Sequence, residues 1–321
     1  MTPGPAPNGG PPAVSVIVPA RDAAGTIGRT MEALAAQDIA QPYEVIVVDD
    51  GSGDDTAAVA QRAAAPVRVV RTEGVGPGPA RNTGVEASRG AVLAFTDADC
   101  APAPDWLRAG LQAMDGVDLV QGRVEPDPAS ALGPFDHTVW VVRESGLYET
   151  ANLFVRRELF ERLEGFEDFL GARIGKPLAE DAWLGWRARR SGARTEFASE
   201  ALVHHAVLDR GPAGYVGERL RLVYFPAIAK RVPEIRRSLL FGRLFLTRRS
   251  AAFDLAVAGV AIAALRRSPL PLVAAAPYLA ELSRYGRRWR SARVATVEAG
   301  ADAVGFAALA WGSIRNGSPV L

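Results

Sequence analysis

Two aspartates, Asp97 and Asp99, close an apolar run in the stretch AVLAFTDADC at residues 91–100. Residues two apart in an extended chain point to the same side, so these carboxylates would repel each other unless a cation lay between them. Hard divalent cations such as Mg²⁺ prefer carboxylate oxygens combined with substrate phosphates. The spacing therefore predicts a metal-binding site, and a solvated turn after the strand is the alternative.

More acidic residues follow other apolar runs. Asp22 follows the run at residues 14–20, and Asp50 ends the run at residues 43–50. The carboxyl ends of parallel strands meet at one edge of a sheet, where ligands bind, so we expect these acids and Asp97 to share one rim. For Asp22 a helix-capping role is the alternative. Their neighbours at the same strand ends, also expected to contact a ligand, are Pro19, Arg21 and Gly51.

A glycine-rich segment, EGVGPGPARNTGVEASRG, occupies residues 73–90. Its glycines permit close approach of the backbone to a ligand, and Arg81 can donate paired hydrogen bonds to a phosphate. The segment is neither a GxxxxGK[ST] phosphate loop nor a GxGxxG dinucleotide fingerprint after the first strand. It predicts a phosphate-contacting loop, with a flexible loop capped by a short helix as the alternative.

The elements that must position these residues alternate between strand and helix patterns. Between the first two strands, Ile27, Met31 and Leu34 recur at helical spacing, and residues 54–65 open with acids before an alanine-rich body. This alternation predicts an α/β fold with a mostly parallel sheet flanked by helices. The β-branched runs that predict strands lie at residues 14–20, 43–50, 67–72 and 91–97.

Composition limits the partners. The 321 residues carry a formal net charge of +1 and no extended basic run before the C-terminal third, which argues against a nucleic-acid partner. The single cysteine, Cys100, cannot form an internal disulfide, which fits a cytoplasmic location. Residues 1–13 lack the basic start and apolar core of a signal peptide, so we expect a disordered tail there.

Six stretches in register resemble the family 2 glycosyltransferases, which have a GT-A (Rossmann-like) fold. They are VSVIVPARDAAGTI, VIVVDDGSGDDT, GPGPARNTGVEASRG, FTDADC, TANLFVRRELFERLEGF and AEDAWLGWRARRSGAR, within residues 14–205. The resemblance implies transfer of a sugar from a nucleotide-diphosphate sugar to a hydroxyl acceptor, with Mg²⁺ or Mn²⁺ as cofactor and inversion of the anomeric carbon. The QxxRW motif of processive polysaccharide synthases is not visible, so we expect a single addition per encounter.

The resemblance also implies roles for individual residues. Asp22 and Asp50 would contact the base and ribose of the nucleotide. Asp97 and Asp99 would form the DxD motif that holds the metal ion and the diphosphate. Asp181, in the pair ED, would be the catalytic base.

The surroundings of Asp181 can also be interpreted from the residues. Asp181 opens a helix that Gly192 ends, and compensation of the helix dipole is its alternative role. The stretch GARIGKPLAED at residues 171–181 predicts a mobile acceptor loop. His204 and His205 fall where some relatives place a histidine that assists the metal or diphosphate; one of them is a further candidate ligand, and we choose His204.

The C-terminal region differs in composition. We assign residues 14–210 to the catalytic domain and residues 211–321 to a helical extension in which arginine clusters alternate with alanine, leucine and valine. Its uncharged stretches run about 11 to 13 residues, short of the roughly 20 that span a bilayer. Pro269 and Pro271 break it into separate helices. We expect contact with the cytoplasmic face of a membrane, where a lipid-linked acceptor could be presented; packing on the catalytic domain or a second copy is the alternative.

Two other functions compete with glycosyl transfer. A sugar-phosphate nucleotidyltransferase would share the sheet, the carboxylates and the glycine-rich segment, but should carry a basic signature where VSVIVPARDAAGT has only Arg21. An inactive sugar-nucleotide-binding protein should have lost at least one of the four acids. All four are present: Asp50, Asp97, Asp99 and Asp181.

Overall fold

The computed structural model describes residues 11–63, 65–167 and 178–321, which form two compact units. The first unit extends to Ala131 and includes Thr138–Val207, and the second consists of Leu132–His137 and Leu208–Leu321. Most of the expected tail, residues 1–10, and most of the expected acceptor loop, residues 171–177, lie outside the described residues.

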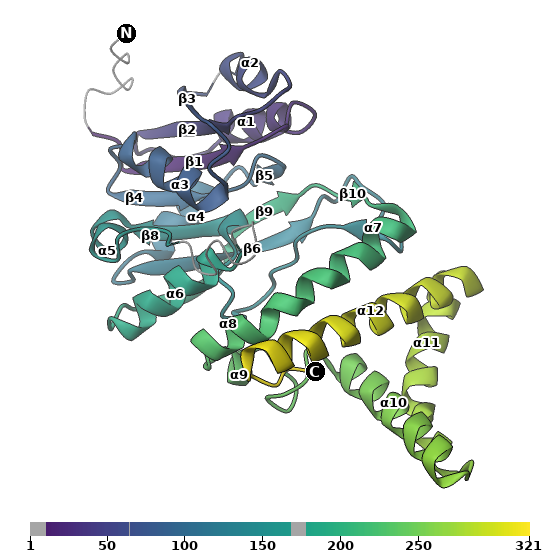
Figure 1. The fold of residues 1–321 in the computed structure, drawn as a ribbon. Coiled ribbons are helices and arrows are strands. Elements are labelled where there is room, and N and C mark those ends of the chain that lie inside the picture. The colour runs from purple at the N-terminus through teal and green to yellow at the C-terminus, as the bar shows by residue number, and fades with distance from the viewer. Residues whose placement is uncertain (1–10, 64, 168–177) are drawn as a thin grey trace. The chain divides into compact units, whose positions relative to one another are not determined.

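The first unit is built on one sheet in the order β3-β2-β1-β4-β8-β6-β9-β5 (Figure 1). Strands β1 to β4 pair in parallel, and β6 pairs in parallel with β9, whereas β8 and β5 run antiparallel to their neighbours. The mostly parallel sheet predicted from the sequence is therefore confirmed. The strands are β1 (Val14–Ala20), β2 (Tyr43–Asp50), β3 (Val67–Thr72), β4 (Val92–Phe95), β5 (Cys100–Pro102), β6 (Leu119–Pro126), β8 (Leu153–Arg156) and β9 (Thr195–His205).

Helices cover both faces of this sheet. On one face, Val16 packs in a core with Met31 and Trp106. On the other face, Gly84 allows a helix to approach closely, because a Cβ there would lie 2.6 Å from Ile17 Cγ2. The helices of this unit are α1 (Ile27–Ala35), α2 (Thr56–Gln61), α3 (Pro77–Glu86), α4 (Trp106–Ala113), the short 3-10 helix η1 (Thr150–Asn152), α5 (Arg157–Arg162) and α6 (Glu180–Arg190).

The fourth strand ends earlier than the sequence predicts. Strand β4 stops at Phe95, and the next residues leave the ladder as a turn in which the Cys100 amide donates to the Asp97 carbonyl at 3.1 Å. The buried Thr96 fixes this departure, since its hydroxyl donates to the Ala151 carbonyl at 3.0 Å. The expectation that Asp97 and Asp99 share one side of an extended strand is therefore wrong, because both lie in the turn beyond it.

The second unit is mainly helical. A short ribbon of β7 (Asp136–His137) and β10 (Leu208–Asp209) precedes the helices. Leu309 packs with Ala229 and Leu240 in a small core, and Gly312 lets its helix approach the Val223 carbonyl, to which a Cβ would lie at 2.2 Å. The helices are α7 (Gly211–Glu218), η3 (Arg219–Tyr224), α8 (Phe225–Arg231), α9 (Ile235–Ser238), α10 (Arg248–Arg266), η4 (Leu270–Ala275), α11 (Ala276–Arg288) and α12 (Ala292–Asn316).

One helix of this unit meets a simple test for a membrane span. Within the described residues, α12 alone is long and apolar enough to cross a bilayer by length and composition. It also carries Glu298, which is 2% exposed and forms an ion pair with Arg249 of α10 at 2.7 Å. This buried ion pair gives α12 a packed role among the helices of its own unit.

Candidate active site

Asp50 fastens the glycine-rich loop to the sheet. Its carboxylate, 4% exposed at the end of β2, accepts hydrogen bonds from the Thr72 hydroxyl at 2.6 Å, the Val75 amide at 2.7 Å and the Gly76 amide at 2.8 Å. Burial opposes ionisation of Asp50, but these hydrogen bonds outweigh it and lower the pKa of the carboxyl. Gly76 has a φ of 94°, in the region that favours glycine, and α3 starts at the next residue.

The loops that follow β1 and β2 are joined to each other. Asp22 accepts from the Gly53 amide at 2.8 Å, and its own amide donates to the Ser52 hydroxyl at 3.0 Å. The residue directly before helix α1 is Thr26, so Asp22 does not occupy the capping position. The exposed carboxylate of Asp22 and the exposed guanidinium of Arg21 form an ion pair at 3.9 Å at this rim.

Two further predicted residues belong to the same rim through their backbone. Gly51 has a φ of 72°, and a Cβ there would lie 3.1 Å from the Gly74 amide nitrogen, so a side chain at this position would be strained. Pro19 is buried within β1, beside Val48 of β2 in the register. The Pro19 side chain therefore belongs to the sheet and not to an exposed surface.

Arg81 joins two acids from distant parts of the chain. Its guanidinium donates to Asp97 at 2.9 Å and to Glu180, at the start of α6, at 3.3 Å. The Arg81 side chain is 7% exposed, that of Glu180 9% and that of Asp97 30%. Arg81 therefore holds the turn after β4 against helix α6, a contact that the sequence prediction of a phosphate ligand did not include.

Asp181 follows Glu180 in the first turn of α6 and is half-buried. Its carboxylate accepts from the Ala182 amide at 2.7 Å. The pKa of Asp181 lies well above its usual range, because burial disfavours the ionised form and the carboxylates of Glu180 and Glu149 add repulsion. Sequence reasoning missed Glu149, which precedes η1 without a motif; burial raises its pKa as well.

Asp99 lies in a cluster that can hold a metal ion. One ligand atom each from Asp99, Cys100 and His205 lies within 4.8 Å of the others, and His205 Nε2 is 3.6 Å from Asp99 Oδ2. Burial raises the pKa of the Cys100 thiol well above its usual range, with Asp97 and Asp99 adding to the effect, so Cys100 stays protonated. The carboxylate of Asp99 suits a hard divalent cation such as Mg²⁺ or Mn²⁺, and His205 offers an imidazole nitrogen beside it.

The predicted ligand His204 is not part of this three-residue cluster. Together with Asp99 and residues of α1 it lines a cavity of about 140 Å³, and its Nδ1 is buried without a hydrogen-bond partner among the described residues. The register of β5 with β9 places His205, and not His204, opposite Cys100. Of the two histidines, His205 belongs to the cluster with Asp99 and Cys100, whereas the choice of His204 as a ligand stays a prediction.

Comparison with known proteins identifies similar chains. Residues 15–161 match the family model of glycosyl transferase family 2. The chain is 35% identical over 225 residues to Glycosyltransferase AglE of Haloferax volcanii, covering 65% of this chain and 70% of that protein. It is 28% identical over 226 residues to Undecaprenyl-phosphate 4-deoxy-4-formamido-L-arabinose transferase of Pseudomonas fluorescens, covering 66% of this chain and 62% of that protein.

A solved structure has the same fold. Mannosyltransferase PcManGT from Pyrobaculum calidifontis, in complex with GDP-Man and Mn²⁺, superposes with a TM-score of 0.54. The match has 23% sequence identity and covers 98% of this chain and 89% of that one. The predicted GT-A fold is confirmed.

Proposed function

The chain belongs to glycosyl transferase family 2 and is a nucleotide-sugar-dependent glycosyltransferase, and on this premise we propose that it adds a single sugar to a hydroxyl acceptor with inversion, aided by a divalent cation. Family membership also sets the nucleotidyltransferase alternative aside. We propose four things beyond family membership: the metal requirement, the inversion, the acceptor and the residue roles.

One observation carries the residue roles. Arg81 binds Asp97, which belongs to the donor side of the proposed reaction, and Glu180, whose neighbour Asp181 is the proposed base. A base acts only when it lies within hydrogen-bond reach of the proton that it removes, so its position relative to the donor must be fixed. The buried guanidinium of Arg81 binds both acidic motifs and so holds the base in a fixed position relative to the donor.

The proposed chemistry divides between the two acidic motifs. Asp99 and His205, whose ligand atoms lie close together, would hold Mg²⁺ or Mn²⁺, and Asp97 would complete the DxD motif. The ion would supply positive charge against the diphosphate leaving group. Asp181 accepts the proton of the acceptor hydroxyl while that oxygen bonds to the anomeric carbon and the bond to the diphosphate breaks. Its raised pKa brings its basicity closer to neutral pH, as general-base catalysis favours. In-line displacement by one base inverts the anomeric carbon.

The loops around Asp22 and Asp50 are proposed to receive the nucleotide. The exposed side chains of Arg21 and Asp22 are available for contact with the base or ribose. Asp50 acts through the loop that it holds, since its carboxylate already accepts three hydrogen bonds from residues 72–76. Asp50 is therefore proposed as a positioning residue for the donor.

The acceptor is proposed to be a hydroxyl carried on a lipid-linked glycan, at the cytoplasmic face of the cell membrane. Support comes from the similarity to a relative whose name includes undecaprenyl phosphate, a lipid phosphate. The single free cysteine, Cys100, is compatible with a reducing compartment.

A donor panel tests the proposal. Purified full-length protein is incubated with UDP-sugars and GDP-sugars, with Mn²⁺ or with a chelator, and release of the nucleoside diphosphate is measured. We expect slow release from one donor that stops in chelator and accelerates when lipid-linked glycans are added. Absence of release from every donor would support the inactive binding protein, and full activity in chelator would contradict the metal role.

A further inference from the structure

Large apolar side chains are exposed around the turn that joins α10 to α11. We call residues 262–273 the hairpin tip. Three of its large apolar side chains are mostly exposed: Leu265 is 84% exposed, Leu270 79% and Val273 76%. Ile262 and Leu272, also in the hairpin tip, are 43% and 46% exposed. Several exposed large apolar side chains within one short segment often mark a surface that another molecule covers.

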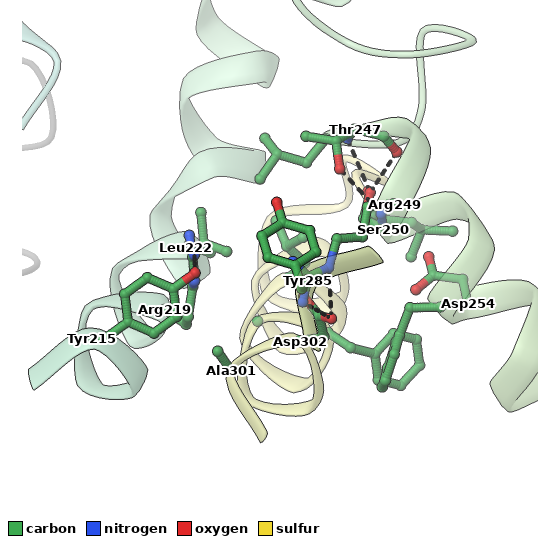
Figure 2. Close-up of a pocket in the computed structure, with 16 residues that line it drawn as sticks. Tyr215, Arg219, Leu222, Thr247, Arg249, Ser250, Asp254, Tyr285, Ala301 and Asp302 are labelled. Carbon is green, nitrogen blue, oxygen red and sulfur yellow. Dashed lines mark hydrogen bonds and ion pairs between the residues drawn. The ribbon is translucent and has the colours of Figure 1, made fainter. Parts of the chain in front are cut away.

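The hairpin that carries this tip is firmly held at its other end. Arg249, in the first turn of α10, forms ion pairs with Glu298 at 2.7 Å and Asp302 at 2.6 Å, both on α12. Its guanidinium also stacks on Tyr285 of α11, 4.5 Å from the ring centre. Figure 2 shows this root, with Arg249, Tyr285 and Asp302 converging beside a cavity of about 290 Å³. The three helices are thus fastened together at the root.

The two arms of the hairpin stay close between the root and the tip. Phe253 of α10 meets Tyr278 of α11 with ring centres 5.0 Å apart. Further along, a Cβ on Gly259 would lie 2.6 Å from the Pro271 carbonyl oxygen, so the arms touch there. At 1.5 Å per residue, the tip lies roughly 27 Å along α10 from Arg249. The apolar side chains at the tip are therefore presented by an ordered hairpin.

Charge indicates what covers the tip. Residues 255–280 contain two arginines, Arg266 and Arg267, and no aspartate or glutamate. Both arginines lie within the apolar hairpin tip, an arrangement that suits anionic lipid headgroups above an acyl layer. Of the described helices, α10 is not among those that are long and apolar enough to span a membrane. The combination favours shallow insertion over crossing.

We propose that the hairpin tip docks onto an anionic lipid bilayer. Leu265, Leu270 and Val273 enter the boundary between headgroups and acyl chains, while Arg266 and Arg267 pair with the headgroups. The docking itself does not depend on the proposed function. Its purpose, to hold the active site near a lipid-linked acceptor, rests on the proposed function.

Vesicle sedimentation of the full-length chain tests the proposal. Vesicles of phosphatidylcholine with one quarter phosphatidylglycerol are compared with vesicles of phosphatidylcholine alone. The double variant Leu265→Ser/Leu270→Ser should bind the anionic vesicles roughly 100-fold more weakly, since each buried leucine contributes about tenfold. Arg266→Gln/Arg267→Gln should remove the preference for anionic vesicles.

Leu255→Ser is the matched control. Leu255 is a 50% exposed leucine on the same helix, and it lies roughly 15 Å along α10 from Leu265, beyond the about 5–10 Å depth of interfacial insertion. We expect its vesicle binding to stay within about twofold of the unmodified protein. An equal loss from Leu255→Ser would overturn docking through the tip.

Other occupants give different results. If the tip packs on the rest of the chain, the double variant lowers the melting temperature and the unmodified protein does not sediment with vesicles. If a second copy covers it, the double variant abolishes a concentration-dependent dimer. Either result overturns the proposal. Vesicle binding without sugar transfer would refute only the proposed function, and transfer to a soluble acceptor without vesicle binding would refute only the docking.

Discussion

Replacement of Arg81 by methionine tests whether the site depends on the buried guanidinium. Methionine keeps most of the side-chain volume but leaves Asp97 and Glu180 facing each other without a cation. Removing one partner of a buried ion pair costs about 3–5 kcal/mol. Glu180 is 9% exposed, but Asp97 is 30% exposed and water can solvate it, so we expect the low end, about 3 kcal/mol.

Thermal unfolding measures this loss. For a unit of this size, 1 kcal/mol corresponds to about 2–4 °C, so Arg81→Met should melt about 6–12 °C below the unmodified protein. Adding Glu180→Gln to Arg81→Met should recover part of the loss, because it removes one of the two unpaired charges. The melting temperature of Arg81→Lys should lie between those of Arg81→Met and the unmodified protein, since one ammonium group cannot bind two carboxylates as the forked guanidinium does.

Arg108→Met provides the control. Arg108 is a half-exposed arginine that pairs with Asp105 at 3.5 Å within one helical turn, a contact worth only about 0–1 kcal/mol. It should leave the melting temperature nearly unchanged. If Arg81→Met melted like Arg108→Met, or if Glu180→Gln made Arg81→Met less stable, the bridge would not hold the site together.

Three further outcomes follow from the site. Because Asp181 must be ionised to accept a proton and its pKa is raised, the acid limb of the kcat/KM profile should lie above the ordinary aspartate pKa of about 3.9. Glu149→Gln removes a repelling charge and should move this acid limb to lower pH; an unmoved limb would exclude the repulsion. Asp99→Ala and His205→Ala should each raise the Mn²⁺ concentration that gives half-maximal turnover at least about tenfold, while His204→Ala should not. A larger effect from His204→Ala than from His205→Ala would contradict the assigned cluster. Gly110→Ala should destabilise the fold by about 1–3 kcal/mol in denaturant unfolding, because a Cβ would lie 2.2 Å from the Phe154 ring, and an unchanged midpoint would show that the ring can move aside.

The sheet could be predicted because buried strands consist of runs of β-branched and other apolar residues, which are visible in the sequence. The strand runs at residues 14–20, 43–50 and 67–72 coincide with β1, β2 and β3, and every residue of β1 is buried. Once these runs are parallel strands, their carboxyl ends must meet at one edge. This topology explains why strand-end acids such as Asp50 could be selected from the sequence alone.

The geometry of the acids could not be predicted, because contacts between distant residues decide it. The Thr96 hydroxyl binds the Ala151 carbonyl, 55 positions away, at the point where the chain turns to place Asp97 and Asp99 beyond β4. Arg81 meets Glu180 across 99 positions, and no local pattern indicates that pairing. Local sequence therefore identified the acidic groups but not their partners.

The choice between two adjacent histidines depended on strand register. His204 and His205 are alike in sequence, and alternation along β9 sends their side chains to opposite faces. The antiparallel pairing places His205 opposite Cys100, next to Asp99 in the chain. Strand β9 also carries an irregularity in its pairing with β6 near Gly122 and Arg123, and neither register can be located from residue types.

The most direct test of the account separates donor binding from sugar transfer in Asp181→Asn. Calorimetric titration with the donor selected by the panel, in Mn²⁺, is paired with turnover on the acceptor, and Asp115→Asn, an exposed aspartate in a turn, serves as the control. The account predicts that Asp181→Asn binds the donor within about threefold of the unmodified protein but transfers sugar at least about 100-fold more slowly. Donor binding and transfer that fall together, or transfer that persists, would contradict the role of Asp181 as the base.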